Sequence, residues 1–269
     1  MSWKSGAGPG SYFQLKIGGF GIYFKSDQNG IIPVLRRRYG RFSGAGGADF
    51  RFEVSEAPGR REPFKPAIIP ARDSLVVKRG DFRAELDLRT GKGTLEAAPT
   101  EQCLDAFLRS FLSARLLASG GLMLHSAGIV KKGCAYLFLG KSGAGKSTLS
   151  KLAAAGGAEV ISDEINLLRP GKGGFRVYGS PFWGEMRADG RPGSWPLGGI
   201  VLLKKAKANR VLPCSKPAAL KLLLRCLLNF DKSPGTAERV LENSFSLLGG
   251  VKFSGLEFTK TGAGFLELI

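Results

Sequence analysis

The sequence predicts an α/β protein of the α+β type, in which a small β-rich domain precedes a domain built on a mixed sheet. Three observations lead to this fold class. Runs of alternating apolar and polar residues recur through residues 11–98, as in half-buried strands. An apolar run at 134–139 leads into a glycine-rich loop and then into a helical pattern. A three-residue turn at 131–133 joins that run to a preceding apolar run at 122–130, and so short a turn connects only antiparallel strands.

These observations divide the chain into three parts. Residues 1–10 are small and polar and are expected to form a flexible N-terminus. Residues 11–98 form the β-rich domain, and residues 99–269 form the domain that contains the glycine loop. In the β-rich domain, apolar and polar residues alternate at 13–17 and again at 82–88. We expect a mostly antiparallel sheet there, without catalytic residues of its own.

Charge distinguishes this composition from that of an ordinary globular protein. Lys and Arg number 40 against 22 Asp and Glu, which gives a formal net charge of +18. Such a surplus favours an anionic partner: a nucleotide, a nucleic acid, an acidic protein or a membrane surface. Four scattered cysteines and one histidine exclude the familiar zinc motifs. Because no apolar run reaches about 18 residues and no apolar leader opens the chain, we expect a cytoplasmic protein without a membrane partner.

A basic and aromatic cluster at Arg36–Phe42 raises the question of nucleic-acid binding. Arginines with interleaved aromatic side chains can grip phosphates and stack on bases. No recognisable nucleic-acid motif accompanies the cluster, so a solvated face of a strand or loop is the preferred interpretation. A nucleic acid is therefore a disfavoured partner, and an acidic peptide is equally compatible with the cluster.

A helix is expected to open the second domain. Thr100 can cap it, and Ser119-Gly120-Gly121 can end it. Its apolar residues recur with helical spacing at Leu104, Phe107, Leu108, Phe111, Leu112 and Leu116. This stripe is expected to pack into the core.

The next segment, Leu122–Val130, is expected to form one strand beside the strand at 134–139. It carries His125, the only histidine of the chain. A lone histidine is usually structural. Its expected position beside the glycine loop makes a catalytic role an open alternative, in which it accepts a proton or holds an oxygen in place.

The glycine loop between the strand at 134–139 and the following helix fits the pattern G-x-x-x-x-G-K-[ST]. In this context the pattern predicts a phosphate-binding loop for a nucleotide. Glycines let successive N–H groups point at phosphate oxygens, Lys146 reaches the terminal phosphates, and the Ser147 hydroxyl can ligate Mg²⁺. The predicted nucleotide-binding residues are Gly140, Lys141, Ser142, Gly143, Ala144, Gly145, Lys146, Ser147 and Thr148.

Two adjacent carboxylates follow the next apolar strand. Ala158–Ser162 ends in Asp163 and Glu164, 17 and 18 positions after the loop lysine Lys146. An acid at the end of a strand close to a phosphate loop can hold Mg²⁺, and a second acid can accept a proton. The alternative is an acidic turn without a catalytic role.

The remaining chain offers fewer chemical signals. Arg187 and Arg191 lie in a glycine-rich loop that could cover the site and contact a phosphate, although surface arginines are the ordinary interpretation. Expected elements are a strand at 200–203, a helix that begins after Ser215, a helix from Thr236 to Gly249-Gly250, and closing strands at Val251–Phe258 and Phe265–Ile269.

With these residues placed, residues 100–269 resemble the C-terminal catalytic domain of HPr kinase/phosphorylase, and still more the HPr-kinase-like proteins found near peptide-modification gene clusters. The segments that carry the resemblance are Leu124–Gly128, Gly140–Thr148, Ile161–Glu164, Gly179–Glu185 and Pro196–Ile200. Residues 11–98 resemble the β-rich leader of that group only loosely.

The resemblance implies a P-loop fold of the phosphoenolpyruvate-carboxykinase type, with ATP and Mg²⁺ as cofactors. It implies catalytic roles for His125, Asp163 and Glu164, and metal binding by Ser147, Asp163 and Glu185. The second acid here is Glu164, where the family has Asp, and this leaves open which of the two acids is the base. The signature that follows the metal glutamate in true HPr kinases is absent, so HPr is not the expected acceptor.

The sequence thus predicts a kinase that transfers the γ-phosphoryl group of ATP to a hydroxyl of a peptide, a protein or a small molecule. Two other classes stay open: a nucleotide-binding regulatory or scaffold protein without transfer, and a conventional P-loop ATPase or GTPase. The last is disfavoured because no N-K-x-D or L-S-G-G-Q motif occurs. A homo-oligomer is compatible with all three.

Overall fold

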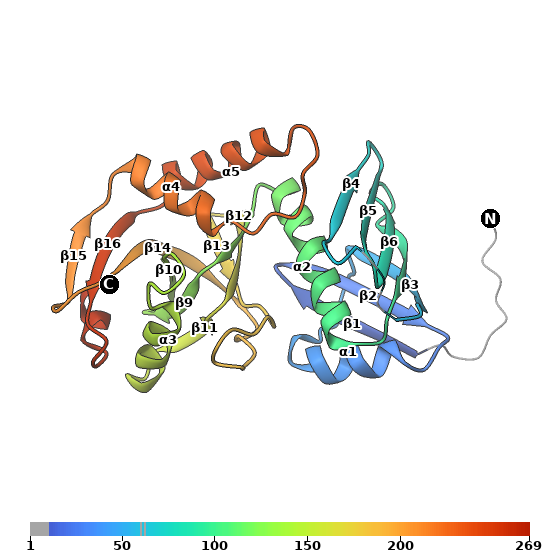
Figure 1. The fold of residues 1–269 in the computed structure, drawn as a ribbon, viewed down its shortest axis with the longest axis horizontal. Coiled ribbons are helices and arrows are strands. Elements are labelled where there is room, and N and C mark those ends of the chain that lie inside the picture. The colour runs from blue at the N-terminus through green and yellow to red at the C-terminus, as the bar shows by residue number, and fades with distance from the viewer. Residues whose placement is uncertain (1–10, 60, 62) are drawn as a thin grey trace. The chain divides into compact units, whose positions relative to one another are not determined.

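The computed structural model describes residues 11–59, 61 and 63–269, so the expected flexible N-terminus at 1–10 lies outside the described residues. It confirms the α+β class, with two mixed sheets and five α-helices among the described residues. The chain divides into two compact units: Met1–Phe111 with Phe230–Ser233, and Leu112–Asn229 with Pro234–Ile269 (Figure 1).

The first unit contains a seven-stranded sheet in the order β1-β2-β3-β7-β6-β5-β4. Strand β3 is parallel to both of its neighbours, and the other described pairs are antiparallel. Side chains alternate along these strands between a buried and a solvated face, as the sequence pattern predicts. The strands are β1 (Ser11–Ile17), β2 (Phe20–Ser26), β3 (Phe50–Glu56), β4 (Ala67–Pro70), β5 (Ser74–Arg79), β6 (Phe82–Asp87) and β7 (Lys92–Ala97).

Two helices contribute to the first unit, and the second of them continues into the second unit from Leu112. Helix α1 (Ile31–Tyr39) continues into the short 3₁₀ helix η1 (Gly40–Phe42), and α2 (Glu101–Ala118) begins after Thr100, whose side chain accepts a hydrogen bond from the Cys103 N–H at 3.2 Å. Phe107 of α2 meets Phe52 of β3 edge to face, with ring centroids 5.6 Å apart. This contact belongs to the aromatic core of the unit.

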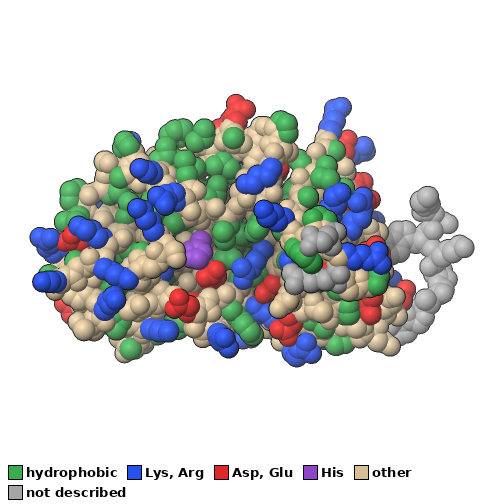
Figure 2. Space-filling view, viewed as in Figure 1, with side chains coloured by type: hydrophobic (Ala, Val, Ile, Leu, Met, Phe, Trp, Pro, Cys, Tyr) green, Lys and Arg blue, Asp and Glu red, His purple; other side chains and the backbone are tan. Residues whose placement is uncertain are grey.

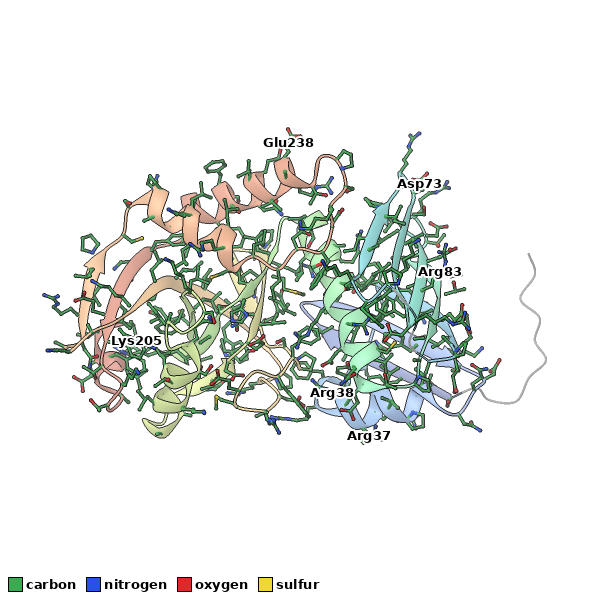
Figure 3. The ribbon with its side chains drawn as sticks, in the orientation of Figure 1. Arg37, Arg38, Asp73, Arg83, Lys205 and Glu238 are labelled. Atoms are coloured by element: carbon green, nitrogen blue, oxygen red, sulfur yellow. The ribbon has the colours of Figure 1, made fainter. Side chains whose placement is uncertain are left out.

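The basic cluster at Arg36–Phe42 is helical, which corrects the expected strand or loop. The periodic burial of Ile31, Ile32, Val34 and Leu35 explains the helix. Arg37 pairs with Glu101 at 3.0 Å and Arg38 with Asp105 at 3.4 Å, both on α2; Figure 3 labels these two arginines. Arg36 donates to the Tyr12 carbonyl. The three arginines therefore hold elements of this unit together.

The second unit contains a nine-stranded sheet, whose main path is β11-β9-β10-β14-β13-β12-β8. Strands β15 and β16 extend it, because β16 pairs in parallel with β14 and antiparallel with β15. The strands are β8 (Leu122–His125), β9 (Ala127–Lys131), β10 (Cys134–Leu139), β11 (Glu159–Ser162), β12 (Ile165–Gly171), β13 (Gly174–Tyr178), β14 (Ser194–Lys205), β15 (Arg210–Pro213) and β16 (Phe253–Phe258).

Helices cover both faces of this sheet (Figure 1). Leu137 of β10 packs into the same core cluster as Leu223 and Leu247, which lie on α4 (Lys216–Cys226) and α5 (Thr236–Gly250). Phe138, the next residue along β10, packs on the other face with Leu149 of α3 (Lys146–Ala155). Two hydrophobic cores thus fix β10 from both sides, and β10 is the strand that leads into the glycine loop.

The hairpin that leads into the loop is confirmed, because β9 and β10 pair antiparallel with Lys131 opposite Cys134. The expectation of one continuous strand over Leu122–Val130 is wrong. The chain breaks at Ser126, β8 pairs with β12, and β9 pairs with β10 and β11. Asn166 donates to the Ser126 carbonyl at 2.8 Å and to its hydroxyl at 3.0 Å, which stabilises the break.

The end of the chain differs from the expectation of a closing strand. Residues Gly264–Leu268 form the 3₁₀ helix η2, and Phe265 is fully buried against Phe138 and Phe258. A five-residue segment with four apolar residues, as at Phe265–Ile269, does not distinguish a strand from a short helix, and here the packing of one aromatic ring decides between them. None of the described helices combines the length and the apolar character needed to cross a membrane.

Candidate functional site

The topology of the second sheet brings four chain segments to one edge. Strands β10 and β11 are both antiparallel to β9, so they run in the same direction and end at the same edge. Strand β14 is parallel to β10 and also ends there, at Lys205. Strand β9 starts at this edge, directly after His125 and Ser126. Ligands of open α/β sheets bind outside the carboxyl ends of such strands, so this edge is the place to look for a site.

The glycine loop leaves β10 at this edge and turns into α3. Gly143 and Gly145 have φ of 75° and 101°, values that non-glycine residues rarely adopt. A Cβ at Gly145 would also lie 2.7 Å from the Phe258 ring. Among the described residues no side chain caps α3, and its first turn contains no acid. The first N–H groups of the helix and its positive dipole end are therefore available to an anion.

Lys146 is the first residue of α3 and lies buried beneath the loop, at 7% exposure. Its Nζ donates to the Gly140 carbonyl at 3.0 Å. Burial lowers the pKa of the Lys146 ammonium from its ordinary value, whereas nearby Cys226, Glu164 and Glu185 oppose this shift. No carboxylate of the described ranges forms an ion pair with Lys146, so its environment is suited to a bound anion that supplies negative charge.

The acidic pair follows β11 in a turn held by Ser162. The Ser162 hydroxyl accepts hydrogen bonds from the N–H groups of Glu164 and Ile165, at 3.2 and 3.1 Å. Asp163 is only 4% exposed, and its Oδ2 accepts a hydrogen bond from the Met186 N–H at 2.9 Å. The segment around Met186 therefore packs directly on this carboxylate.

Gly184 permits that close approach. A Cβ at this position would lie 2.6 Å from Asp163 Oδ2, well inside contact distance. The segment is further tied to the sheet at its far end, where the N–H of Gly190 donates to Ser180 and that of Arg191 to Ile161. Glu185, the next residue after Gly184, is thereby carried to the site.

His125 lies at the end of β8, and its Nδ1 is 3.6 Å from Glu164 Oε1. The backbone joins the same two places, because the Ser126 N–H donates to the Glu164 carbonyl at 3.0 Å. The histidine is thus beside the acidic pair, although its strand does not pair with the loop strand as expected. The purple histidine is visible at the surface in Figure 2.

These groups line one cavity of about 530 Å³. Of the predicted nucleotide-binding, catalytic and metal-binding residues, all but Ala144 lie in its wall, whereas the candidate phosphate contacts Arg187 and Arg191 do not; Ala144 packs against the core under the loop. The cavity wall consists of His125, Gly140, Lys141, Ser142, Gly143, Gly145, Lys146, Ser147, Thr148, Asp163, Glu164, Glu185, Lys205, Arg225, Cys226 and Leu228.

Four of these residues were not expected from the sequence: Lys205, Arg225, Cys226 and Leu228. Lys205 could have been predicted from the sequence, because it ends an apolar strand. A strand that pairs in parallel with β10 must end at the same edge of the sheet as the glycine loop. The other three follow from the tertiary position of α4, for which the sequence contains no local signal. Arg191, one of the two arginines considered for a phosphate contact, instead pairs with Glu159 and lies over the Trp195 ring at 5.8 Å.

The predicted metal ligands fit Mg²⁺ only in part. Ser147, Asp163 and Glu185 all face the cavity and offer the hydroxyl and carboxylate oxygens that Mg²⁺ prefers. Within the described ranges no three His, Cys, Asp or Glu side chains converge into a metal-binding cluster. Mg²⁺ is commonly held by one or two carboxylates together with substrate phosphates, and this donor set fits that mode.

Comparison with known proteins adds one likeness. The family model described as "ScmC: SynChlorMet cassette protein ScmC" matches residues 106–226, less than half of the chain but including the glycine loop and the acidic pair. No curated protein matches the chain.

This finding corrects the family resemblance drawn from the sequence. The matching family is ScmC and not HPr kinase/phosphorylase, so the identification with HPr-kinase-like proteins is wrong. The segments that suggested it are short, and a loop that cradles phosphate or an acid at the end of a strand recurs in proteins of different families. Between residues 106 and 226 the chain is similar to the SynChlorMet cassette protein ScmC.

Proposed function

We propose that this chain binds ATP with Mg²⁺ at the glycine loop and transfers the γ-phosphoryl group to a hydroxyl of a peptide, a protein or a small molecule. One observation carries the proposal: the loop, the buried Lys146 and the carboxylates Asp163 and Glu164 line the same cavity. Phosphoryl transfer requires mainly positioning and charge neutralisation, and these are the groups that provide them. In this proposal the second unit is a P-loop domain whose loop strand is the second arm of a hairpin.

The loop side of the cavity would bind the triphosphate. The N–H groups from Gly143 to the start of α3 would donate to phosphate oxygens, and Lys146 would exchange its bond to the Gly140 carbonyl for the terminal phosphates. The exchange costs little because the Gly140 carbonyl also accepts a weak hydrogen bond from Cys226 Sγ at 3.8 Å. The lysine thus moves from a neutral acceptor to a charged one, which favours binding.

Ser147, Asp163 and Glu185 would hold Mg²⁺ next to the phosphates. When bound, the metal would neutralise charge on the β- and γ-phosphate oxygens. The Met186 N–H holds the Asp163 carboxylate through Oδ2, which leaves Oδ1 for another partner.

Glu164 and His125 would act on the hydroxyl group that accepts the phosphoryl group. The acceptor oxygen attacks the γ-phosphorus, its proton passes to the Glu164 carboxylate, and the bond to the β-phosphate oxygen breaks to release ADP. His125 Nδ1, 3.6 Å from Glu164 Oε1, would orient that carboxylate for the proton transfer. Asp163 is less suited to be the base, since its carboxylate is almost fully buried and already accepts a hydrogen bond.

The proposal is tested by label transfer from [γ-³²P]ATP with Mg²⁺ to a panel of serine-containing peptides and small alcohols. We expect label on at least one acceptor. Glu164→Gln should lower the rate of transfer by roughly 10²–10⁴-fold, because general-base catalysis contributes about that much. Nucleotide affinity should stay within a few-fold, since this residue is assigned to the acceptor.

The matched control is Glu242→Gln, an exposed glutamate on α5 outside the cavity, which should transfer label like the wild type. Binding of ATP by the wild type without transfer to any acceptor, and without hydrolysis that the variants change, would contradict the kinase. It would favour a nucleotide-binding regulatory protein.

A second prediction concerns the contact at Gly184. Gly184→Ala should lower the transfer rate by roughly 10²-fold, because the new methyl group would displace the Glu185 segment from Asp163 and small misplacements near reacting groups have effects of that size. Gly249→Ala is the control: it lies in α5, and a Cβ there would meet no atom within 4 Å. Equal transfer rates for the two variants would show that the close approach at Gly184 does not matter.

A further inference from the structure

The cavity contains an arginine to which the mechanism above gives no role. Arg225 lies in the last turn of α4 and lines the cavity with the loop and the acidic pair. It is exposed there, and its guanidinium makes no hydrogen bond or ion pair with any residue that the structure describes. This distinguishes it from Arg191 and Arg210, which pair with Glu159 and Glu257.

The residues after Arg225 are fixed on both sides of the cavity. On the loop side, Cys226 is buried and its Sγ donates to the Gly140 carbonyl. On the other side, Leu227 forms a bridge with Leu124, and the Leu228 N–H donates to the Met123 carbonyl at 2.9 Å. Both of these partners lie on β8, the strand that ends in His125.

The end of α4 therefore spans from the first residue of the glycine loop to the histidine strand. In the proposed function the loop binds the triphosphate, and His125 with Glu164 receives the acceptor. Arg225 directly precedes this span and lines the same cavity as the loop, His125 and Glu164. A guanidinium presents two parallel N–H donors that match two phosphoryl oxygens.

Besides Arg225 and Lys141, which belongs to the glycine loop itself, two lysines line the cavity. Lys146 lies under the loop and donates to Gly140. Lys205 runs past the start of α3, where its Cε is 3.4 Å from the position of a Cβ on Gly145; Figure 3 labels this lysine at the end of β14. The positions of Lys146 and Lys205 suit contacts with the phosphates that remain on the nucleotide after transfer.

We propose that Arg225 contacts the γ-phosphoryl group during its transfer and neutralises the charge that develops on it, as an arginine finger supplied by the same chain. This inference rests on the proposed function, because it presupposes a triphosphate on the loop. In nucleotide-hydrolysing proteins such an arginine raises the rate by about 10³–10⁵-fold and acts mainly on the transition state. Arg225 should accordingly matter little for ADP and much for a mimic of the transferring phosphoryl group.

The test compares Arg225→Ala, Arg225→Lys and the wild type in the affinity for MgADP alone and for MgADP with aluminium fluoride. We expect MgADP affinity to stay within about 3-fold, and the gain in affinity from aluminium fluoride to fall at least about 100-fold in Arg225→Ala. Arg225→Lys should recover part of the gain, since it keeps the charge but not the two parallel donors.

Lys221→Ala is the matched control. It removes an exposed cation from the same helix, one turn before Arg225 and outside the cavity, and should leave the gain unchanged. Unchanged MgADP affinity also shows that the Arg225 variants are folded. A gain in Arg225→Ala equal to that of the wild type overturns the inference while the proposed function stands. A wild type that binds neither MgADP nor MgATP overturns the proposed function and the inference with it.

Discussion

Lys146→Ala is expected to weaken MgATP binding by roughly 2–5 kcal/mol, the range measured when one partner of a buried, hydrogen-bonded charge pair is removed. Label transfer should fall below detection. Lys146 is buried beneath the loop, and its Nζ donates to the Gly140 carbonyl. Its loss therefore leaves the terminal phosphates without their buried counter-charge. Isothermal titration with MgATP measures the affinity directly.

The control for this variant is Lys151→Ala, an exposed lysine on the same helix that lies outside the cavity. It should bind MgATP like the wild type. Similar affinities for Lys146→Ala and Lys151→Ala would rule out the assignment of the loop as the nucleotide site.

The pH dependence of binding distinguishes Lys146 further. Burial lowers the pKa of its ammonium, so the neutral amine forms at a lower pH than on an exposed lysine. A bound phosphate favours the charged form, and affinity should therefore fall as the pH rises through that pKa. Lys146→Ala should lack this alkaline loss.

Asp163→Asn is expected to lower the transfer rate by roughly 10²–10³-fold, the loss found when a preorganised electrostatic contact is removed from an active site. The amide keeps the size of the carboxylate and can still accept the Met186 N–H, so the segment around Glu185 should stay in place. What changes is the charge next to the phosphates. The Mg²⁺ concentration needed for half-maximal transfer should rise at the same time.

Asp73→Asn, at an exposed aspartate of the first unit that Figure 3 labels, is the matched control and should change neither the rate nor the Mg²⁺ dependence. A Mg²⁺ dependence in Asp163→Asn identical to that of the wild type would exclude Asp163 as a metal ligand. Circular dichroism of both variants checks that the charge change has not altered the fold.

The parts of the fold that the sequence predicts well are those with local causes. The strand at 134–139, the glycine loop and α3 follow one another directly, and each is marked by its own composition. Helix α2 starts at its Thr100 cap, and α4 begins after Ser215, whose hydroxyl accepts the Ala218 N–H. In such cases hydrophobic period and capping residues agree, and tertiary packing has no reason to override them.

The errors arise where distant residues decide. Whether Leu122–Val130 is one strand depends on Asn166, 40 positions after Ser126, which bonds the residue at the break. Helix α1 carries three consecutive arginines, and two of them pair with acids on α2 more than 60 positions later. These ion pairs cannot be read from the seven residues of the cluster, so the sequence does not predict its helix, although Arg36, Arg37 and Arg41 are exposed as a solvated face requires.

The candidate site shows the same division. The loop and the acidic pair are short motifs with a mechanism, and the sequence indicates both. Arg225 and Cys226 are at the cavity because α4 crosses from β8 to Gly140, and nothing in the sequence of α4 marks its last turn as different from an ordinary amphipathic helix. Lysines and arginines are spread over the face shown in Figure 2. Charge alone therefore does not distinguish Arg225 from the other cations.

The pairing of β9 with both β10 and β11 limits where this site can gain or lose residues during evolution. Ile129 is opposite Tyr136 of β10 on one side and Val160 of β11 on the other. The register of this single strand therefore fixes the positions of both the loop and the acidic pair along the sheet. Insertions in the connection after α3, at 156–158, would lengthen the path without moving either motif, at an entropic cost of about 0.6 kcal/mol per doubling of loop length. An insertion within β9 would shift its register against both neighbours at once. Natural length variation is therefore expected around α3 and not in the five residues of β9.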